Sequence, residues 1–338
     1  MDSLCPKITD IAISARLAAG CEAEIFLGGL KSVPNRQLVL RRSDKVKEMA
    51  ASIANEVNVC KTLSTDGKRN PLVGDFLFCI QTNAAIYRAA PFYNGGNLQD
   101  VGGYHDLSKA CAEVVEAVAH VHSLGYAHRD VKPENILLNG KGHCKLVDFG
   151  LCIPVKKDGS TKCFIPGEGT QEWAAPEVWD VPESGYCPMK ADWYSVGLAL
   201  HYMATGKLLK PKEKPSAELP EVLYELVEGL TAFHPEDRLC EAEEIKVQAF
   251  FEDIDFHHLR EEARTNKPGP VKIQDKTLKQ RFPMWRDLKT EDVFGPDAWI
   301  CDVDEEEVQQ FDGEIPDFVG INCVSDLYKN TLLKLAQK

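Results

Sequence analysis

The sequence predicts an α+β protein in which a β-rich first quarter is followed by a larger, mostly helical body. Residues 10–42 form short alternating runs broken by Gly-Gly and Pro, a pattern typical of a β-hairpin and a third strand. Apolar residues recur at helical spacing in four later segments: 108–124, 190–205, 219–232 and 241–249. The stretch PFYNGG at 91–96 separates the two patterns, so we interpret it as a connector.

The other elements follow from the same two periodicities. A helix is predicted over 45–63, and two short strands are predicted near 74–80 and 84–90. Ser108 is a natural N-cap for the first helix of the body. Beyond the helical body the chain is irregular and includes the acidic run DVDEEE at 302–307. This last part is expected either to wrap the body or to be partly disordered.

Composition and charge exclude several classes of function. The chain has 338 residues, 44% apolar and 27% charged, with a formal net charge of -13. Such an acidic chain is not expected to bind nucleic acid or an anionic membrane as its main partner. The charge is compatible with a basic peptide substrate, and equally with a plain soluble surface. No run of eighteen apolar residues exists, so no membrane span is predicted.

The cysteines and the first residues predict a location inside the cell, in the cytoplasm or the nucleus. Twelve cysteines are scattered without a C-x-x-C pair or a zinc-type cluster. We interpret them as reduced thiols, with disulfides as the alternative. MDSLCPKITD has no basic region followed by an apolar stretch, so no signal peptide is expected.

Two motifs carry the strongest chemical signal. In HRDVKPEN (128–135), the Asp130 carboxylate can accept a hydroxyl proton, the Lys132 ammonium can meet developing phosphate charge, and the Asn135 amide can hold a metal ion. KLVDFG (145–150) adds Asp148 as a second metal-binding oxygen donor, of the kind that Mg²⁺ prefers. In this order and context the two motifs predict phosphoryl transfer.

These motifs resemble those of the eukaryotic protein kinase family, and the resemblance covers roughly residues 10–258. APE (175–177), DWYSVG (192–197) and HPEDRL (234–239) are similar to the family's substrate-binding segment, its buried aspartate helix and the arginine that pairs with the APE glutamate. The implied pair here is Arg238 with Glu177. Lys132 two residues after Asp130 is typical of the serine/threonine branch. A small-molecule kinase would have little use for the three additional segments.

The resemblance implies a two-lobed kinase fold, with the motif residues meeting in a cleft between the lobes. The implied boundaries are a β-rich N-lobe over 1–90, a helical C-lobe over 91–258 and a C-terminal tail over 259–338. Residues 243–259 and KPGPVKI resemble the end of the domain and the start of the tail in the AGC group. The best candidate for that group's tail docking motif is Phe318-x-x-Ile321, with a loosely packed apolar tail as the alternative.

The nucleotide-covering part departs from the family pattern. LAAGCEAEIF (17–26) aligns with the glycine-rich loop but keeps only Gly20, with alanines at the other two glycine positions; Ile25 keeps the apolar residue over the base. The family lysine that holds the α- and β-phosphates is replaced by Arg41, and Val39 adds bulk under the adenine. Glu56 is the implied helix partner of Arg41. An arginine can form a bidentate pair there but is wider than a lysine.

The connector implies further contacts with ATP. Aligned on its two glycines, it puts Ala90 at the gatekeeper position, Tyr93 in the hinge and Asn97 where an acidic residue commonly meets the ribose. Leu137 is a further candidate for binding the cofactor. The implied cofactors are ATP and Mg²⁺.

The activation segment, Asp148 to Glu177, carries few signs of regulation by phosphorylation. Thr170 is interpreted as structural, and Pro166 occupies the position at which AGC kinases often carry a phosphorylated threonine. Glu168 either supplies negative charge near Arg129 or is a solvated loop residue, the second being favoured.

Two functions remain open. The first is a divergent serine/threonine kinase that transfers the γ-phosphoryl group of ATP to protein or peptide substrates. The second is a pseudokinase that acts as a scaffold or allosteric regulator of a protein partner, with weak or no nucleotide binding. The complete set of base and metal residues favours the first function, and the altered nucleotide side favours the second.

Overall fold

The fold is taken from a computed structural model that describes most of the chain: residues 6–20, 23–45, 50–82, 85–156, 158–265, 267–294 and 323–324. The chain divides into two compact units. We call the first the sheet unit; it comprises Met1–Arg69, Asp75–Phe92 and Lys276–Lys338. We call the second the helical unit; it comprises Asn70–Gly74 and Tyr93–Asp275.

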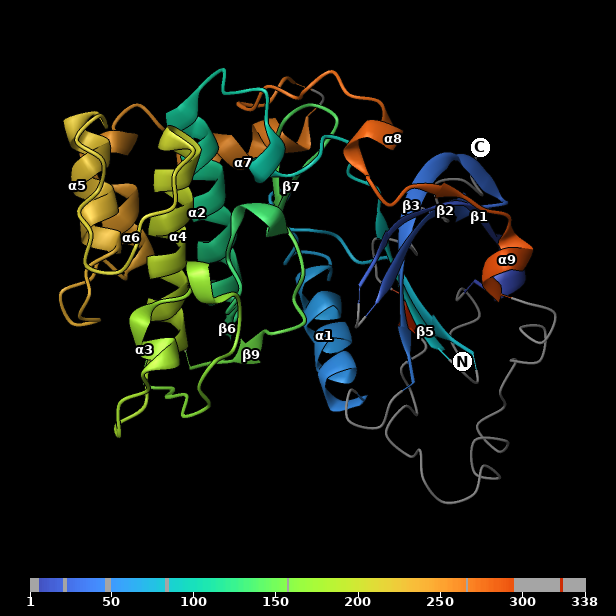
Figure 1. Ribbon diagram of the computed structural model, residues 1–338, viewed down its shortest axis with the longest axis horizontal. Helices are drawn as coiled ribbons and strands as arrows, with labels where there is room; N and C mark the ends of the chain where they lie inside the picture. The colour runs from blue at the N-terminus through green and yellow to red at the C-terminus, as the bar shows by residue number, and fades with distance from the viewer. Residues whose placement is uncertain are drawn as a thin grey trace. The chain divides into compact units, whose positions relative to one another are not determined.

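The sheet unit is built on one antiparallel sheet, which in the described residues has the strand order β10-β1-β2-β3-β5-β4-β11 (Figure 1). The strands are β1 (Ile11–Ala19), β2 (Glu24–Leu30), β3 (Val33–Asp44), β4 (Phe78–Gln81), β5 (Ala85–Pro91), β10 (Arg286–Asp287) and β11 (Cys323–Val324). The helices of this unit are α1 (Ala50–Leu63), α8 (Leu278–Arg281), α9 (Thr290–Phe294) and the 3₁₀ turn Ile8–Asp10.

Alternation along the strands decides which side chains reach each face of this sheet. In β1 every second residue from Ile11 to Leu17 is buried, as expected for a strand with one core face. Leu40, Phe78 and Tyr87 pack together on one face. On the other face Ile53 and Val57 of α1 pack against Phe76, Cys79 and Ile86. An apolar contact therefore holds the helix to the sheet.

The helical unit is organised around α2 (Leu107–Ser123) and α4 (Pro188–Thr205), which pack side by side (Figure 1). Its other helices are α3 (Pro176–Trp179), α5 (Glu221–Leu230), α6 (Ala242–Lys246), α7 (Phe256–Arg264) and the 3₁₀ turns Leu98–Asp100, Pro133–Asn135, Gln171–Trp173 and Ala249–Phe251. Two short antiparallel pairs complete it: β6 (Tyr126–Ala127) with β9 (Ile153–Pro154), and β7 (Ile136–Leu138) with β8 (Cys144–Leu146).

The α+β prediction is confirmed, while several element ends differ from the sequence prediction. The predicted N-cap of α2 is wrong, because Asp106 accepts a hydrogen bond from the Lys109 backbone N at 2.9 Å and Ser108 lies inside the first turn. A carboxylate competes well with a hydroxyl for this position. The predicted helix over 219–232 is the shorter Glu221–Leu230, which starts after Pro220.

Some sequence predictions fall outside the described residues. These are the tail docking candidate Phe318-x-x-Ile321 and the acidic run at 302–307. Among the described helices, none is long and apolar enough to cross a bilayer. The cysteines that the structure describes are free thiols: Cys60, Cys79, Cys111, Cys144, Cys152, Cys163, Cys187 and Cys240.

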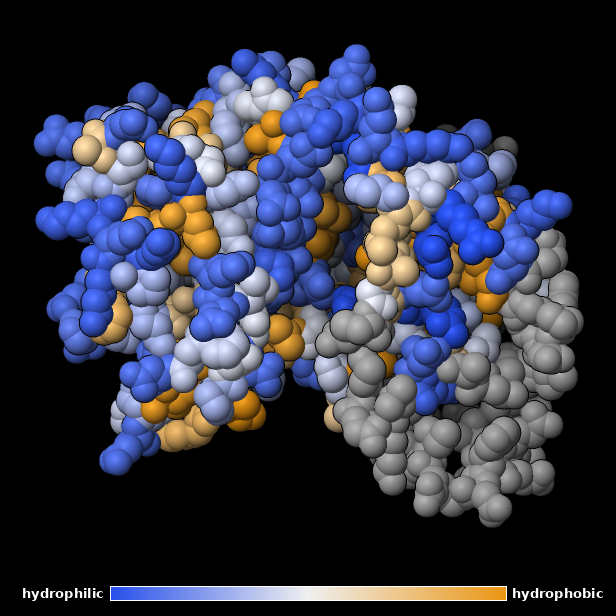
Figure 2. Space-filling model, viewed as in Figure 1, coloured by the Kyte–Doolittle hydropathy of each residue, from blue (hydrophilic) through white to orange (hydrophobic). Residues whose placement is uncertain are grey.

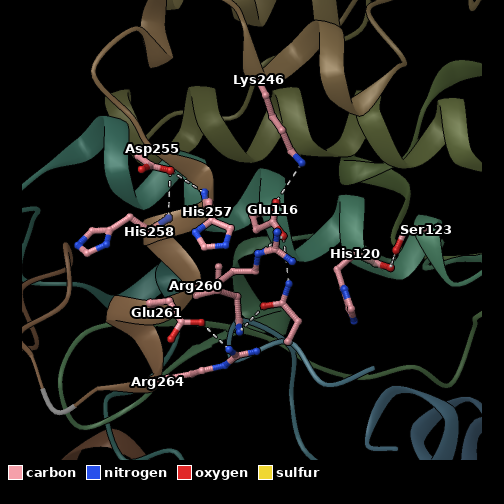
Figure 3. Close-up of polar contacts among 12 residues, drawn as sticks. Glu116, His120, Ser123, Lys246, Asp255, His257, His258, Arg260, Glu261 and Arg264 are labelled. Atoms are coloured by element: carbon pink, nitrogen blue, oxygen red, sulfur yellow. Dashed lines mark hydrogen bonds and ion pairs between the residues drawn. The ribbon is translucent and has the colours of Figure 1, made fainter. Parts of the chain in front are cut away.

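A buried carboxylate on α2 joins distant parts of the helical unit. Figure 3 shows Lys246 of α6 and Arg260 of α7 directed at Glu116. Lys246 Nζ lies 3.1 Å from Glu116 Oε2, Arg260 Nε lies 3.3 Å from Oε1, and Asn70 Nδ2 donates to Oε1 at 3.2 Å. The Glu116 side chain is only 4% exposed, so its charge depends on these partners.

Glu116→Gln is expected to lower the free energy of unfolding by about 1–3 kcal/mol, because both cations lose a charged acceptor. Guanidinium denaturation of the purified chain measures the loss. Glu243→Gln is the matched control: Glu243 pairs with the same Lys246 at 3.2 Å, but its side chain is 88% exposed. The control should change stability little. Equal losses in the two variants would contradict a special role for Glu116.

Candidate active site

The loop between β6 and β7 is held in place by one buried carboxylate of α4. Asp192, 1% exposed, accepts hydrogen bonds from the backbone N of His128 and of Arg129, both at 2.7 Å. His122 Nε2 lies 2.8 Å from the same carboxylate. Arg129 has a positive φ of 70°, a conformation that needs such support in a residue with a side chain. The aspartate of DWYSVG is buried, as the resemblance implied, and it anchors this loop.

Asp130 lies at the centre of a hydrogen-bonded group that contains three of the predicted site residues. Its Oδ2 accepts from Lys132 Nζ at 2.7 Å and from Asn135 Nδ2 at 2.8 Å. Its Oδ1 accepts from Thr170 Oγ1 at 2.7 Å, and Lys132 Nζ also donates to Thr170 Oγ1 at 2.6 Å. These bonds give the carboxylate a single orientation before any substrate is present, which is what a general base requires.

Thr170 reaches Asp130 because a glycine precedes it. Gly169 has a φ of 94°, and a Cβ there would lie 2.5 Å from the Arg129 carbonyl oxygen. Only glycine allows that close approach of two backbone segments. The structural role predicted for Thr170 thus has a specific form: it connects the activation segment to the predicted base and to Lys132.

Asn135 is oriented by the same group. It ends the 3₁₀ turn Pro133–Asn135, and its amide nitrogen donates both to the Asp130 carbonyl oxygen, at 2.9 Å, and to the Asp130 carboxylate. With the nitrogen fixed on Asp130, the amide oxygen points the other way. An amide oxygen in a fixed direction suits a Mg²⁺ ligand.

Asp148 follows β8 in a strained conformation that the neighbouring residues support. Its φ is 66°. Val147, just before it, donates its N–H to the Asn135 carbonyl oxygen at 2.9 Å, and its own carbonyl oxygen lies 3.0 Å from His128 Nε2. Phe149, just after it, packs edge-on to His128 at 5.3 Å between ring centroids. Asp148 is therefore tied on both sides to the loop that carries Asp130. A carboxylate and an amide oxygen form a donor set that fits Mg²⁺.

A buried ion pair ties the activation segment to the body of the helical unit. Arg238 Nη1 lies 2.6 Å from Glu177 Oε1, and Nη2 lies 3.1 Å from Oε2. The guanidinium also donates to the carbonyl oxygens of Lys190 and Ala232. The predicted Arg238–Glu177 pair is confirmed. The Arg238 Cζ atom lies 4.9 Å from the centre of the Tyr194 ring, and burial raises the pKa of Tyr194 to about 12.

The same segment and the end of α3 carry an apolar surface that sequence reasoning missed. Phe164, Ile165 and Trp179 are exposed by 61%, 58% and 41%. Figure 2 shows apolar side chains gathered at the surface around α3. Glu168, one-third exposed, has its Oε2 3.8 Å from Arg129 Nη2, so it is a partly solvated residue with a weak ion pair.

In the sheet unit, the predicted Arg41–Glu56 pair forms, but it is not alone. Arg41 Nη1 on β3 lies 3.5 Å from Glu56 Oε1 on α1. Arg88 of β5 also donates to the Glu56 carboxylate, through Nη1 to Oε2. Sequence reasoning missed Arg88. The available signal was a single charged residue in the otherwise apolar strand AIYRAAP, at a position that alternates with Ile86 and so faces α1.

The predicted base-covering residues belong to one apolar cluster of the sheet unit. Ile25 and Val39 pack against Ala15, Leu17 and Leu27. Residues from elsewhere in the chain join the same cluster: Phe92, Leu278, Phe282 and Trp285. The Phe92 and Phe282 ring centroids are 6.1 Å apart. The last part of the chain was expected either to wrap the body or to be partly disordered, and no local sequence pattern predicted these particular contacts.

The remaining predicted residues lie in local turns and pairs. Gly20 N donates to the Ala23 carbonyl oxygen at 2.9 Å in the β1–β2 connection, and Ala90 pairs with Val39 across strands β5 and β3. In the helical unit, Asn97 is bridged to Leu137 and caps the turn Leu98–Asp100. Lys145 Nζ lies 5.4 Å from the centre of the Tyr93 ring.

Comparison with known proteins decides the family. Residues 36–251, more than half of the chain, match the family described as protein kinase domain. The chain belongs to the protein kinase family.

Curated relatives of this chain include serine/threonine-protein kinases. It is 35% identical over 224 residues to serine/threonine-protein kinase AtPK2/AtPK19 of Arabidopsis thaliana, covering 59% of this chain and 46% of that protein. It is 30% identical over 265 residues to ribosomal protein S6 kinase beta of Caenorhabditis elegans, covering 69% and 47%. With serine/threonine-protein kinase SCH9 of Candida albicans it shares 34% over 257 residues, covering 68% and 31%. The chain spans about half or less of the length of these relatives, and the predicted serine/threonine, AGC-like resemblance is confirmed.

Proposed function

We propose that this kinase transfers the γ-phosphoryl group of ATP to serine or threonine hydroxyls of protein substrates. The observation that carries the proposal is the group formed by Asp130, Lys132, Asn135 and Thr170, in which the predicted base is hydrogen-bonded on both oxygens. A scaffold has no need of a carboxylate held this firmly, since each such bond restricts side chains that would otherwise be free.

The proposed reaction assigns one task to each residue. The substrate oxygen forms a bond to the γ-phosphorus while the bond from that phosphorus to the ADP oxygen breaks, and Asp130 accepts the hydroxyl proton. Lys132, already 2.7 Å from Asp130 Oδ2, offers positive charge to the transferred phosphoryl group. Asn135 and Asp148 would hold Mg²⁺, which neutralises phosphate charge when bound.

In the sheet unit, Arg41 would contact the nucleotide phosphates, and the cluster with Ile25 and Val39 would cover the base. The net charge of -13 is consistent with substrates that carry basic residues. We also propose that the protein acts inside the cell. Its N-lobe, C-lobe and tail would be divided near residues 90 and 258.

A second candidate is a pseudokinase that regulates a protein partner. It is favoured by the pairing of Glu56 with two arginines where the family uses one lysine. A wide, planar guanidinium is not a conservative replacement for a compact ammonium at a packed site, so nucleotide affinity would be low.

Incubation of the purified chain with Mg-ATP and generic basic peptides tests the two candidates, with Asp148→Ala as the control. Peptide phosphorylation that disappears in the control is the expected result, together with a thermal shift that needs both Mg²⁺ and ATP. Equal background in both proteins without any thermal shift would reject the enzyme and leave the pseudokinase.

A further inference from the structure

Glu56 of α1 faces two arginines that lie directly opposite each other on neighbouring strands. The antiparallel register of β3 and β5 pairs Arg41 with Arg88. Like charges in such a cross-strand pair repel each other. The Glu56 carboxylate meets both: Oε1 is 3.5 Å from Arg41 Nη1, and Oε2 accepts a hydrogen bond from Arg88 Nη1. One negatively charged carboxylate therefore faces two positively charged guanidinium groups, and its contacts with them differ in strength.

Arg88 holds Glu56 more tightly than Arg41 does. Its contact is a hydrogen bond between charged groups, the stronger class of such bonds, whereas Arg41 makes an ion pair at 3.5 Å. Arg88 Nη2 also donates to Ser43 Oγ at 2.6 Å, which fixes the guanidinium. The Arg88 side chain is 8% exposed and that of Arg41 is 28% exposed, so solvent weakens the second pair more.

We propose that Arg88 is the positioning residue that holds Glu56, and with it α1, against the sheet. The two tasks predicted for residue 41, pairing with Glu56 and contacting phosphates, are then divided between two arginines. Arg88 takes the first task and leaves Arg41 with the second. This division rests on the proposed function only for the role of Arg41 toward nucleotide; the role of Arg88 concerns the sheet unit alone.

Hydrogen exchange of the α1 amides in the full chain tests the assignment directly. Arg88→Gln is expected to speed exchange of α1 by at least about tenfold, because it leaves a buried carboxylate without its main partner. Arg41→Gln should change it by less than about threefold. Arg42→Gln is the matched control, since Arg42 neighbours Arg41 on β3 but pairs with Glu24 and Asp44 instead. The proposal would be overturned if Arg41→Gln increased α1 exchange as much as Arg88→Gln does, or more.

Coupling to Glu56 separates positioning from general stabilisation. With Glu56→Gln already present, adding Arg88→Gln should speed α1 exchange little further, because the group through which Arg88 acts is gone. Additive effects would mean that Arg88 acts elsewhere and would overturn the proposal. Arg88→Lys, which keeps the charge, should recover most of the protection.

If Arg88→Gln does not fold, Ser43→Ala tests whether Arg88 holds Glu56. It removes only the bond that orients Arg88, so α1 exchange should rise by about threefold in the wild-type background and remain unchanged in the Glu56→Gln background. No rise in α1 exchange in Ser43→Ala in the wild-type background would reject the role of Arg88.

A nucleotide readout keeps the two proposals apart. Arg41→Gln should reduce the Mg-ATP thermal shift while leaving α1 protection intact. Arg88→Lys should leave the thermal shift intact and slightly reduce α1 protection. If the wild-type chain shows no Mg-ATP shift, the proposed function fails, and the exchange rates of α1 still decide whether Arg88 holds Glu56.

Discussion

Asp130→Asn is expected to lower the rate of peptide phosphorylation by about 10²–10⁴-fold, the range associated with a positioned general base. Asparagine keeps the size of the side chain and one acceptor oxygen, which can serve either Lys132 and Asn135 or Thr170, so part of the bonding to this position is retained. It cannot accept the substrate's hydroxyl proton. The effect should therefore appear in kcat, measured with saturating Mg-ATP, and much less in KM for ATP.

Asp253→Asn is the control for this variant, because Asp253 is an exposed residue of the same unit. It should leave activity unchanged. The Mg-ATP thermal shift of Asp130→Asn should equal that of the wild type. If Asp130→Asn phosphorylates peptides at the wild-type rate, the carboxylate does not act as the base and the proposed mechanism is wrong.

Arg238→Met is expected to lower the free energy of unfolding by about 3–5 kcal/mol, the usual cost of leaving a buried charge uncompensated. The Arg238 side chain is 0% exposed and that of Glu177 is 6% exposed, and the pair is joined by two contacts of 2.6 and 3.1 Å. The carbonyl oxygens of Lys190 and Ala232 lose a donor in the same change. Denaturation followed by tryptophan fluorescence measures the loss.

The double variant Arg238→Met/Glu177→Met shows whether the cost comes from the unpaired charge. Replacing both partners by apolar residues of similar size should recover part of the lost stability, because no ion is then left buried. If the double variant is as unstable as the sum of the two single variants, the pair itself does not account for the effect. A loss of less than about 1 kcal/mol in Arg238→Met alone would contradict its buried, bidentate geometry.

Residues whose chemistry is encoded locally could be identified before the fold was known. Asp130, Lys132 and Asn135 fall within six positions of one loop, so their order and spacing were sufficient to predict a phosphoryl-transfer site. Arg238 and Glu177 are distant in the chain, but each lies in a recognisable motif, and the structure joins them as expected. The strands of the first quarter were likewise readable from alternation, because a half-buried sheet repeats every second residue.

Contacts made across strands and between remote segments became known from the folded chain alone. Arg88 meets Glu56 because the register of β5 against β3 brings it beneath α1, and a register is a property of the folded sheet. Phe282 contacts Phe92 although it lies nearly two hundred residues further along the chain. No local sequence pattern predicts this contact. Capping by Asp106 rather than Ser108 depended on backbone angles at the start of α2. Each of these contacts arises from the path of the chain in space, which periodicity and motifs constrain but do not specify.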